Sequence, residues 1–170
     1  GWVAYQLGQI LEPDAILLDD ALSNTPFVQA YHNREQPSTY FKSGGSTGGW
    51  GSAAAFGAKL AKPNSDVVLT SGDGYFMFGT PLAGLWAAGH HGAPYLALVF
   101  VNGSYSTGTR GLKGTYPEGA AMRAENYEGG LFDPPPDFAK LAEAANGYGE
   151  TVYEAEEVGP ALKRELEQVR

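Results

Sequence analysis

Two short polar motifs contain the residue types that bind a metal ion and a phosphate group. The first, Ser71-Gly72-Asp73-Gly74, directly follows an apolar run that is typical of a strand buried on both faces. Glycines on either side of a carboxylate allow a sharp turn and let the backbone approach a bulky anion. Gly74 and Tyr75 would then open a helix, with their amides directed at a phosphate. A carboxylate beside a phosphate needs a cation between them, and Mg²⁺ prefers oxygen ligands of this kind.

The second motif, Asn102-Gly103-Ser104, begins 29 residues after Asp73, which is about the length of a helix plus a strand. Its expected place is therefore the end of an adjacent strand. The side-chain oxygen of Asn102 and the backbone carbonyl of Ser104 are both suitable Mg²⁺ ligands. Two simpler interpretations stay open: Asp73 as the N-cap of a helix, and Asn102 as a loop residue in a left-handed conformation.

The elements that position these motifs follow from the spacing of apolar residues. Helical and strand patterns alternate along the chain, which predicts an α/β fold: an open, mostly parallel twisted sheet with helices on both faces. The expected helices cover residues 3–11, 52–60, 82–88, 138–145 and 160–169. The expected strands cover residues 15–18, 40–41, 67–70, 95–101 and 151–153.

The small polar and glycine-rich clusters follow the predicted strands rather than preceding them. They lie at residues 19–24, 43–49, 71–74 and 102–105. In open parallel sheets, ligands bind beyond the carboxyl ends of the strands. We therefore expect one site at that edge of the sheet.

A glycine- and proline-rich stretch at residues 103–136 is the longest segment without a clear pattern. Loops of such length in compact domains are uncommon and are usually lids, binding loops or disordered segments. We predict a long loop there, with residues 105–136 loose until a ligand binds.

Composition limits the class of protein. The 170 residues carry 11 Lys and Arg against 19 Asp and Glu, a net charge of −8, which argues against nucleic-acid binding. The absence of cysteine excludes disulfides, thiolate metal sites and cysteine nucleophiles. No apolar run approaches the roughly 20 residues of a membrane helix. We expect a single domain over residues 1–170, a cytoplasmic fragment of a longer multidomain chain without a membrane partner.

The two motifs together resemble a known family. Gly72-Asp73-Gly74, followed after 27 residues by Asn102-Gly103-Ser104-Tyr105, resembles the diphosphate-binding motif of thiamine diphosphate-dependent enzymes. The resemblance is to the group of acetolactate synthase, pyruvate decarboxylase and benzoylformate decarboxylase. Residues 44–57, 85–88 and 138–142 also resemble segments of that group.

The resemblance implies a thiamine diphosphate-binding fold, with thiamine diphosphate and Mg²⁺ as cofactors. Asp73, the Asn102 side chain and the Ser104 carbonyl would bind the metal. The implied cofactor-binding residues are Ser23, Asn24, Gly72, Gly74, Tyr75 and Tyr105. The implied function is that of a lyase or transferase that decarboxylates or carboligates a small 2-keto acid, the cofactor supplying the chemistry.

The same resemblance implies partners. The glutamate that activates the cofactor's aminopyrimidine lies in a pyrimidine-binding domain of the same family, in the same or a neighbouring subunit. The present chain alone would then be inactive and would act in a homodimer or homotetramer. Three positions differ from the family's pattern: Val101 replaces an asparagine, Tyr75 a polar residue, and Gly48 a bulky apolar residue.

Two other functions fit the sequence. A nucleotide-cofactor α/β domain is one, although Asp19-Asp20-Ala21-Leu22 stands where a glycine-rich G-x-G-x-x-G motif would follow the first strand. A non-catalytic subunit or assembly module that keeps the fold is the other. Ser23 and Asn24 also fit as ordinary turn residues.

Overall fold

The sheet of this protein is parallel throughout. The computed structural model describes residues 1–45, 47–127 and 129–170. Within them, one four-stranded sheet has the order β2-β1-β3-β4, and every neighbouring pair is parallel. The strands are β1 (Ile16–Asp20), β2 (Tyr40–Lys42), β3 (Val67–Gly72) and β4 (Leu96–Phe100). The predicted open parallel sheet is confirmed.

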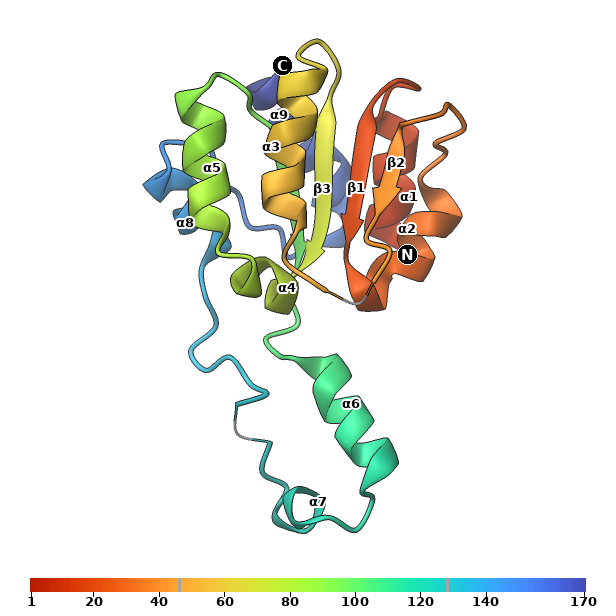
Figure 1. Cartoon of the computed structure of the whole chain (residues 1–170), viewed down its shortest axis with the longest axis vertical. Helices are drawn as coiled ribbons and strands as arrows, with labels where there is room; N and C mark the ends of the chain where they lie inside the picture. Colours follow the sequence, from red (N-terminus) through yellow and green to blue (C-terminus); the bar gives the residue numbers. More distant parts are fainter. Residues whose placement is uncertain (46, 128) are drawn as a thin grey trace.

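Helices form the connections and cover both faces of the sheet (Figure 1). Those on one face include α3, α5 and α8, and α1, α2 and α9 lie on the other. The α-helices are α1 (Trp2–Ile10), α2 (Thr25–Tyr31), α3 (Gly51–Ala61), α4 (Asp73–Phe78), α5 (Pro81–His90), α6 (Ser106–Thr115), α7 (Ala120–Ala124), α8 (Phe138–Ala144) and α9 (Val158–Val169). Two short 3-10 helices are η1 (Leu22–Asn24) and η2 (Ala155–Glu157).

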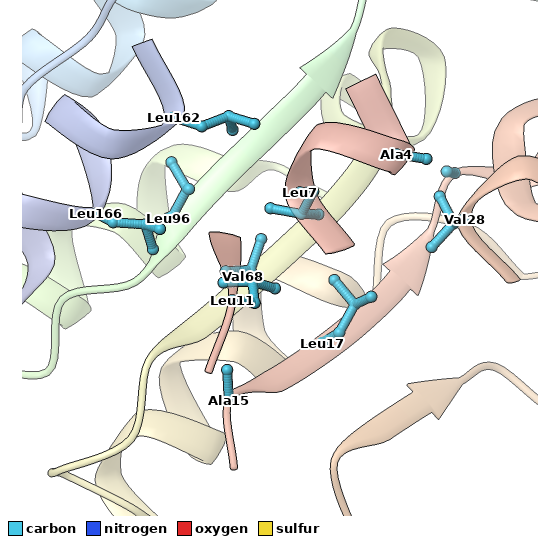
Figure 2. Close-up of a cluster of buried hydrophobic side chains, with 11 residues drawn as sticks. Ala4, Leu7, Leu11, Ala15, Leu17, Val28, Val68, Leu96, Leu162 and Leu166 are labelled. Carbon is cyan, nitrogen blue, oxygen red and sulfur yellow. The ribbon is translucent and has the colours of Figure 1, made fainter. Parts of the chain in front are cut away.

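The core lies on both sides of the two central strands. Because alternate residues of a strand point to opposite faces, Leu17 and Val68 share one face, covered by Leu7 of α1 and Leu166 of α9 (Figure 2). The opposite face is covered mainly by α3, α4 and α5, and its buried members are Ile16, Leu18, Ala55, Val67, Leu69, Phe76, Ala88 and Tyr95. Leu17 is fully buried, so truncating it to alanine is expected to cost about 2–5 kcal/mol.

The order of the strands fixes where a ligand can bind. From β1 the chain crosses to β2 on one side, whereas from β3 it crosses to β4 on the other. The connections diverge between β1 and β3, and such a switch point leaves a crevice at the carboxyl ends of the two strands. These ends point toward α4 in Figure 1.

Three parts of the fold differ from the sequence prediction. Residues 151–153 form no strand, and Tyr153 is 88% exposed. The helix α2 was not predicted. The stretch 103–136 is not a plain loop, because it contains α6 and α7, which project beyond the carboxyl edge of the sheet (Figure 1). None of the helices that the described residues form is long and apolar enough to cross a membrane.

Candidate functional site

Asp73 joins the ends of two neighbouring strands. It is the first residue of α4 and is only 2% exposed. Its Oδ2 accepts the backbone N–H groups of Asn102 at 2.9 Å and Gly103 at 2.7 Å. Its Oδ1 accepts the N–H of Gly74 at 2.8 Å. The two sequence motifs therefore meet, as their spacing predicts, and Asp73 is not a helix N-cap, because Gly72 holds that position without a capping side chain.

Asn102 is held in a short turn by the residues that follow it. Its Oδ1 accepts both the backbone N–H of Ser104 at 3.0 Å and the Ser104 hydroxyl at 2.9 Å. Its Nδ2 donates to the Ser106 hydroxyl at 3.4 Å. The left-handed backbone belongs to Gly103, with φ of +69°, and not to Asn102. The interpretation of Asn102 as a residue with a left-handed backbone is therefore wrong. Its side-chain oxygen would become available to a cation once the Ser104 hydroxyl turns away.

Tyr105 lies directly over the turn that contains Asp73. A Cβ atom built on Gly74 would be 2.8 Å and 2.9 Å from two carbons of the Tyr105 ring. That ring packs edge-to-face on Phe132, with centroids 4.7 Å apart, and the Tyr105 N–H donates to the Gly130 carbonyl at 2.9 Å. Glycine is needed at position 74 because Tyr105 occupies the adjoining space.

Ser23 and Asn24 belong to η1, which follows β1 at the same edge. The Ser23 hydroxyl is 3.2 Å from that of Thr107, in the first turn of α6. The Asn24 N–H donates to the Ala21 carbonyl at 3.1 Å, which closes a turn. Both residues are thus turn residues that lie beside the site.

Tyr75 fills space that a side chain at position 48 would need. A Cβ atom on Gly48 would overlap the Tyr75 ring. Gly48 and Tyr75, two of the positions that differ from the resemblance, are therefore in contact with each other.

Asp20 is a buried carboxylate whose importance was not expected from the sequence. It is 4% exposed, and its Oδ2 accepts the N–H groups of Gly49 at 2.8 Å and Gly51 at 3.4 Å. The pKa of Asp20 is raised to about 6, mainly by burial and to a smaller extent by the charge of Asp19, against the opposing effect of the two amides. The sequence feature that could have indicated Asp20 is the pair of adjacent acidic residues at the end of a buried strand.

Asp19 points away from Asp20 and serves the other face of the sheet. Its Oδ1 accepts the Thr25 hydroxyl at 2.9 Å and the Ala21 N–H at 3.1 Å, and its Oδ2 accepts the Tyr40 hydroxyl at 2.7 Å. Burial, followed by the contact with Asp19, raises the pKa of Tyr40. Both carboxylate oxygens of Asp19 thus accept hydrogen bonds within the fold, which indicates a structural role.

The donor set at Asp73 fits a magnesium ion shared with a phosphate. Within the part of the chain that the structure describes, no three His, Asp or Glu side chains are grouped to hold a metal. Asp73 is in no ion pair there. A cation beside it would need neutral oxygen donors, which Asn102 and Ser104 have, and oxygens from its ligand, which is the usual arrangement for Mg²⁺.

Comparison with known proteins identifies this arrangement. The family model "Thiamine pyrophosphate enzyme, C-terminal TPP binding domain" matches residues 22–170. The chain belongs to this family. Thiamine diphosphate with Mg²⁺ is the usual cofactor of such thiamine pyrophosphate-binding domains.

Relatives of the thiamine pyrophosphate family resemble nearly the whole chain. It is 34% identical over 157 residues to a benzoylformate decarboxylase of Pseudomonas aeruginosa, covering 90% of this chain and 27% of that protein. It is 29% identical over 157 residues to a probable acetolactate synthase large subunit of Methanococcus aeolicus, covering 92% and 25%. The chain therefore spans about a quarter of the length of these relatives.

Solved structures agree with this membership. A thiamine diphosphate-dependent 4-hydroxybenzoylformate decarboxylase of Rhodococcus jostii superimposes with a TM-score of 0.83 at 25% identity. The match covers 98% of this chain and 30% of that one. The thiamine pyrophosphate-binding fold is thus confirmed.

Proposed function

We propose that this chain holds the magnesium-diphosphate half of thiamine diphosphate in a longer enzyme that decarboxylates or carboligates a small 2-keto acid. The observation that carries the proposal is the contact of Asp73 with the amides of Asn102 and Gly103. It brings a buried carboxylate and two neutral oxygen donors to one edge of the sheet. The names of the relatives, benzoylformate decarboxylase and acetolactate synthase, support this reaction class.

The proposed metal ligands are the Asp73 carboxylate, the Asn102 side-chain oxygen and the Ser104 carbonyl. Asp73 is already oriented by three backbone amides, so binding a cation requires little reorganisation of this side chain. The proposed cofactor-binding residues are Ser23, Asn24, Gly72, Gly74, Tyr75 and Tyr105.

When bound, thiamine diphosphate supplies the electron sink for cleavage or formation of the bond next to the keto group. The residues of this chain bind and orient it. The amides of Gly74 and Tyr75 would face the diphosphate, which for Gly74 requires that its N–H turn away from Asp73 Oδ1, its present acceptor. The Tyr105 ring, packed edge-to-face on Phe132, lies over the turn.

The proposal includes a second domain. The chain spans about a quarter of its relatives, and the glutamate that activates the cofactor's pyrimidine would come from a pyrimidine-binding domain of the same or a neighbouring subunit. We further propose a cytoplasmic homodimer or homotetramer.

Calorimetric titration of the longer enzyme that contains this chain with thiamine diphosphate tests the proposal. Binding should need Mg²⁺ and should be lost in Asp73→Ala. It should be unchanged in Asp14→Ala, a control whose carboxylate accepts only an exposed hydrogen bond from Ser65 among the described contacts. Binding that needs no divalent ion, or that survives Asp73→Ala unchanged, would contradict it.

A further inference from the structure

Asp20 lies beside the site without belonging to the proposed metal ligands. It ends β1 and is paired in register with Ser71 of β3, two residues before Asp73. Its Oδ2 accepts the N–H groups of Gly49 and Gly51, so it fastens the turn before α3 to the centre of the sheet. In the described part of the chain, Asp20 forms no ion pair.

The turn that Asp20 holds is packed against both ends of α4. At its start, Gly48 contacts the Tyr75 ring in the first turn of that helix. Gly49, with φ of +87°, packs so closely on the C-cap residue Gly79 that a Cβ atom would lie 2.6 Å from the Gly79 Cα. The position of α4, which begins at Asp73, therefore depends on the turn and through it on Asp20.

The charge of Asp20 is unfavourable to the fold itself. Desolvation raises its pKa to about 6, so the neutral carboxyl is the form that the buried site prefers. The groups that face it are Tyr75 of α4 and the Trp50 indole at the start of α3, and the charge of Asp19 acts on it from the opposite face of the same strand. The Trp50 N–H acts on the carboxylate to lower its pKa, and it has no hydrogen-bond partner among the described residues.

If the role of Asp20 were only structural, asparagine would suit this position better, because it keeps an acceptor oxygen and has no charge. Groups whose ionisation opposes folding are typical of functional sites. The ionised form must then be useful in another state of the protein, and α4 is the element through which it would act.

We propose that Asp20 is a positioning residue of the cofactor site: its carboxylate holds the turn at residues 47–51, and thereby α4, in the arrangement that binds magnesium and thiamine diphosphate. The inference rests on the proposed function. If binding favours the ionised carboxylate, then binding near pH 6, where Asp20 is partly protonated, must release a fraction of a proton per site, because the two equilibria are linked.

The variant Asp20→Asn separates this role from a structural one. We expect a higher melting temperature of the cofactor-free chain at pH 7.5, together with an affinity for thiamine diphosphate and Mg²⁺ reduced about tenfold, the effect of one pKa unit of coupling. The control Asp19→Asn should instead lower the melting temperature, since it disturbs the bonds from Tyr40 and Thr25.

A second measurement needs no comparison of stabilities. Calorimetric titrations at pH 6 in two buffers of different ionisation enthalpy count the protons released on binding. The wild-type chain should release more protons than Asp20→Asn, and the difference removes the contribution of the cofactor's own phosphates.

The outcomes separate the two proposals. Failure of the longer wild-type enzyme that contains this chain to bind the cofactor with Mg²⁺ would overturn the proposed function and this inference with it. Binding by the wild type with equal affinity or equal proton release in Asp20→Asn would overturn the role of Asp20 alone. A joint loss of stability and affinity in Asp20→Asn, with unchanged proton release, would show a merely structural residue.

Discussion

The carboxylate of Asp73 accepts the backbone N–H of Asn102 at 2.9 Å, across 29 residues of sequence. With the amides of Gly74 and Gly103, this contact surrounds a buried negative charge by dipoles rather than by a basic side chain. Hydrogen bonds to a charged group are among the stronger ones. The carboxylate is thus stabilised without a cation from the protein, as expected if its charge serves the proposed metal ion.

The substitution Asp73→Asn should damage both binding and folding. An amide has one acceptor oxygen, so its NH₂ group would face at least one of the three backbone N–H donors. Leaving a buried donor unpaired costs about 1–3 kcal/mol. Urea unfolding should show a loss of that size, and Mg²⁺-dependent cofactor binding should disappear. Unchanged stability would show that the amides do not depend on this carboxylate.

Removal of the Ser104 hydroxyl should increase the affinity for Mg²⁺. In the structure that hydroxyl donates to Asn102 Oδ1, the atom proposed to bind Mg²⁺. The variant Ser104→Ala keeps the backbone carbonyl and removes a competitor whose hydrogen bond is worth about 1 kcal/mol. Mg²⁺ titration should show an affinity up to about fivefold higher. Asn102→Ala is the comparison that should weaken binding, and an opposite order of the two would contradict the assigned ligand atoms.

The contact of Gly74 with Tyr105 should appear as a coupling between two substitutions. Gly74→Ala forces the new methyl group against the Tyr105 ring, which is expected to cost about 1–3 kcal/mol, as for other overpacked sites. Tyr105→Ala should relieve that cost, so the double variant should be more stable than additivity predicts. Additive free energies of unfolding would mean that the ring moves away freely.

Glu165 should make stability depend on pH away from the site. Desolvation, and next the charge of Glu150, raise the pKa of Glu165 from 4.5 to about 7. The folded state prefers protonated Glu165. This side chain therefore stabilises the fold fully below pH 4.5, and its stabilising contribution decreases as the pH rises to 7. Glu165→Gln should therefore be more stable than wild type above pH 7, by at most about 3 kcal/mol. Thermal unfolding at pH 4 and pH 8 checks this, and a larger gain at pH 4 would contradict the sign.

The sheet and the meeting of the two motifs could be predicted, because both depend on short-range patterns. Apolar runs at β1, β3 and β4 indicate strands buried on both faces, and 29 residues are enough for one crossover. The position of Asp20 could not be predicted, since its contacts with Gly49 and Gly51 depend on how a turn 29 residues away returns to the sheet.

The errors in secondary structure have separate causes. In α6, glycines at positions 108, 111 and 114 lower the helix propensity, and none of its residues is buried. Neither propensity nor an apolar stripe therefore indicated a helix. At residues 151–153 the pattern favoured a strand, but that segment pairs with no strand among the described residues.

The meeting of Asp73 and Asn102 also has a consequence for biosynthesis. Because the two residues become neighbours only when β3 and β4 align in parallel, a nascent chain lacks the complete ligand set until α5 and β4 have emerged from the ribosome. Cofactor capture would then report that this late, long-range pairing has been achieved. Because a bound ligand shifts the equilibrium toward the native state, the cofactor would stabilise the protein only after this pairing has formed.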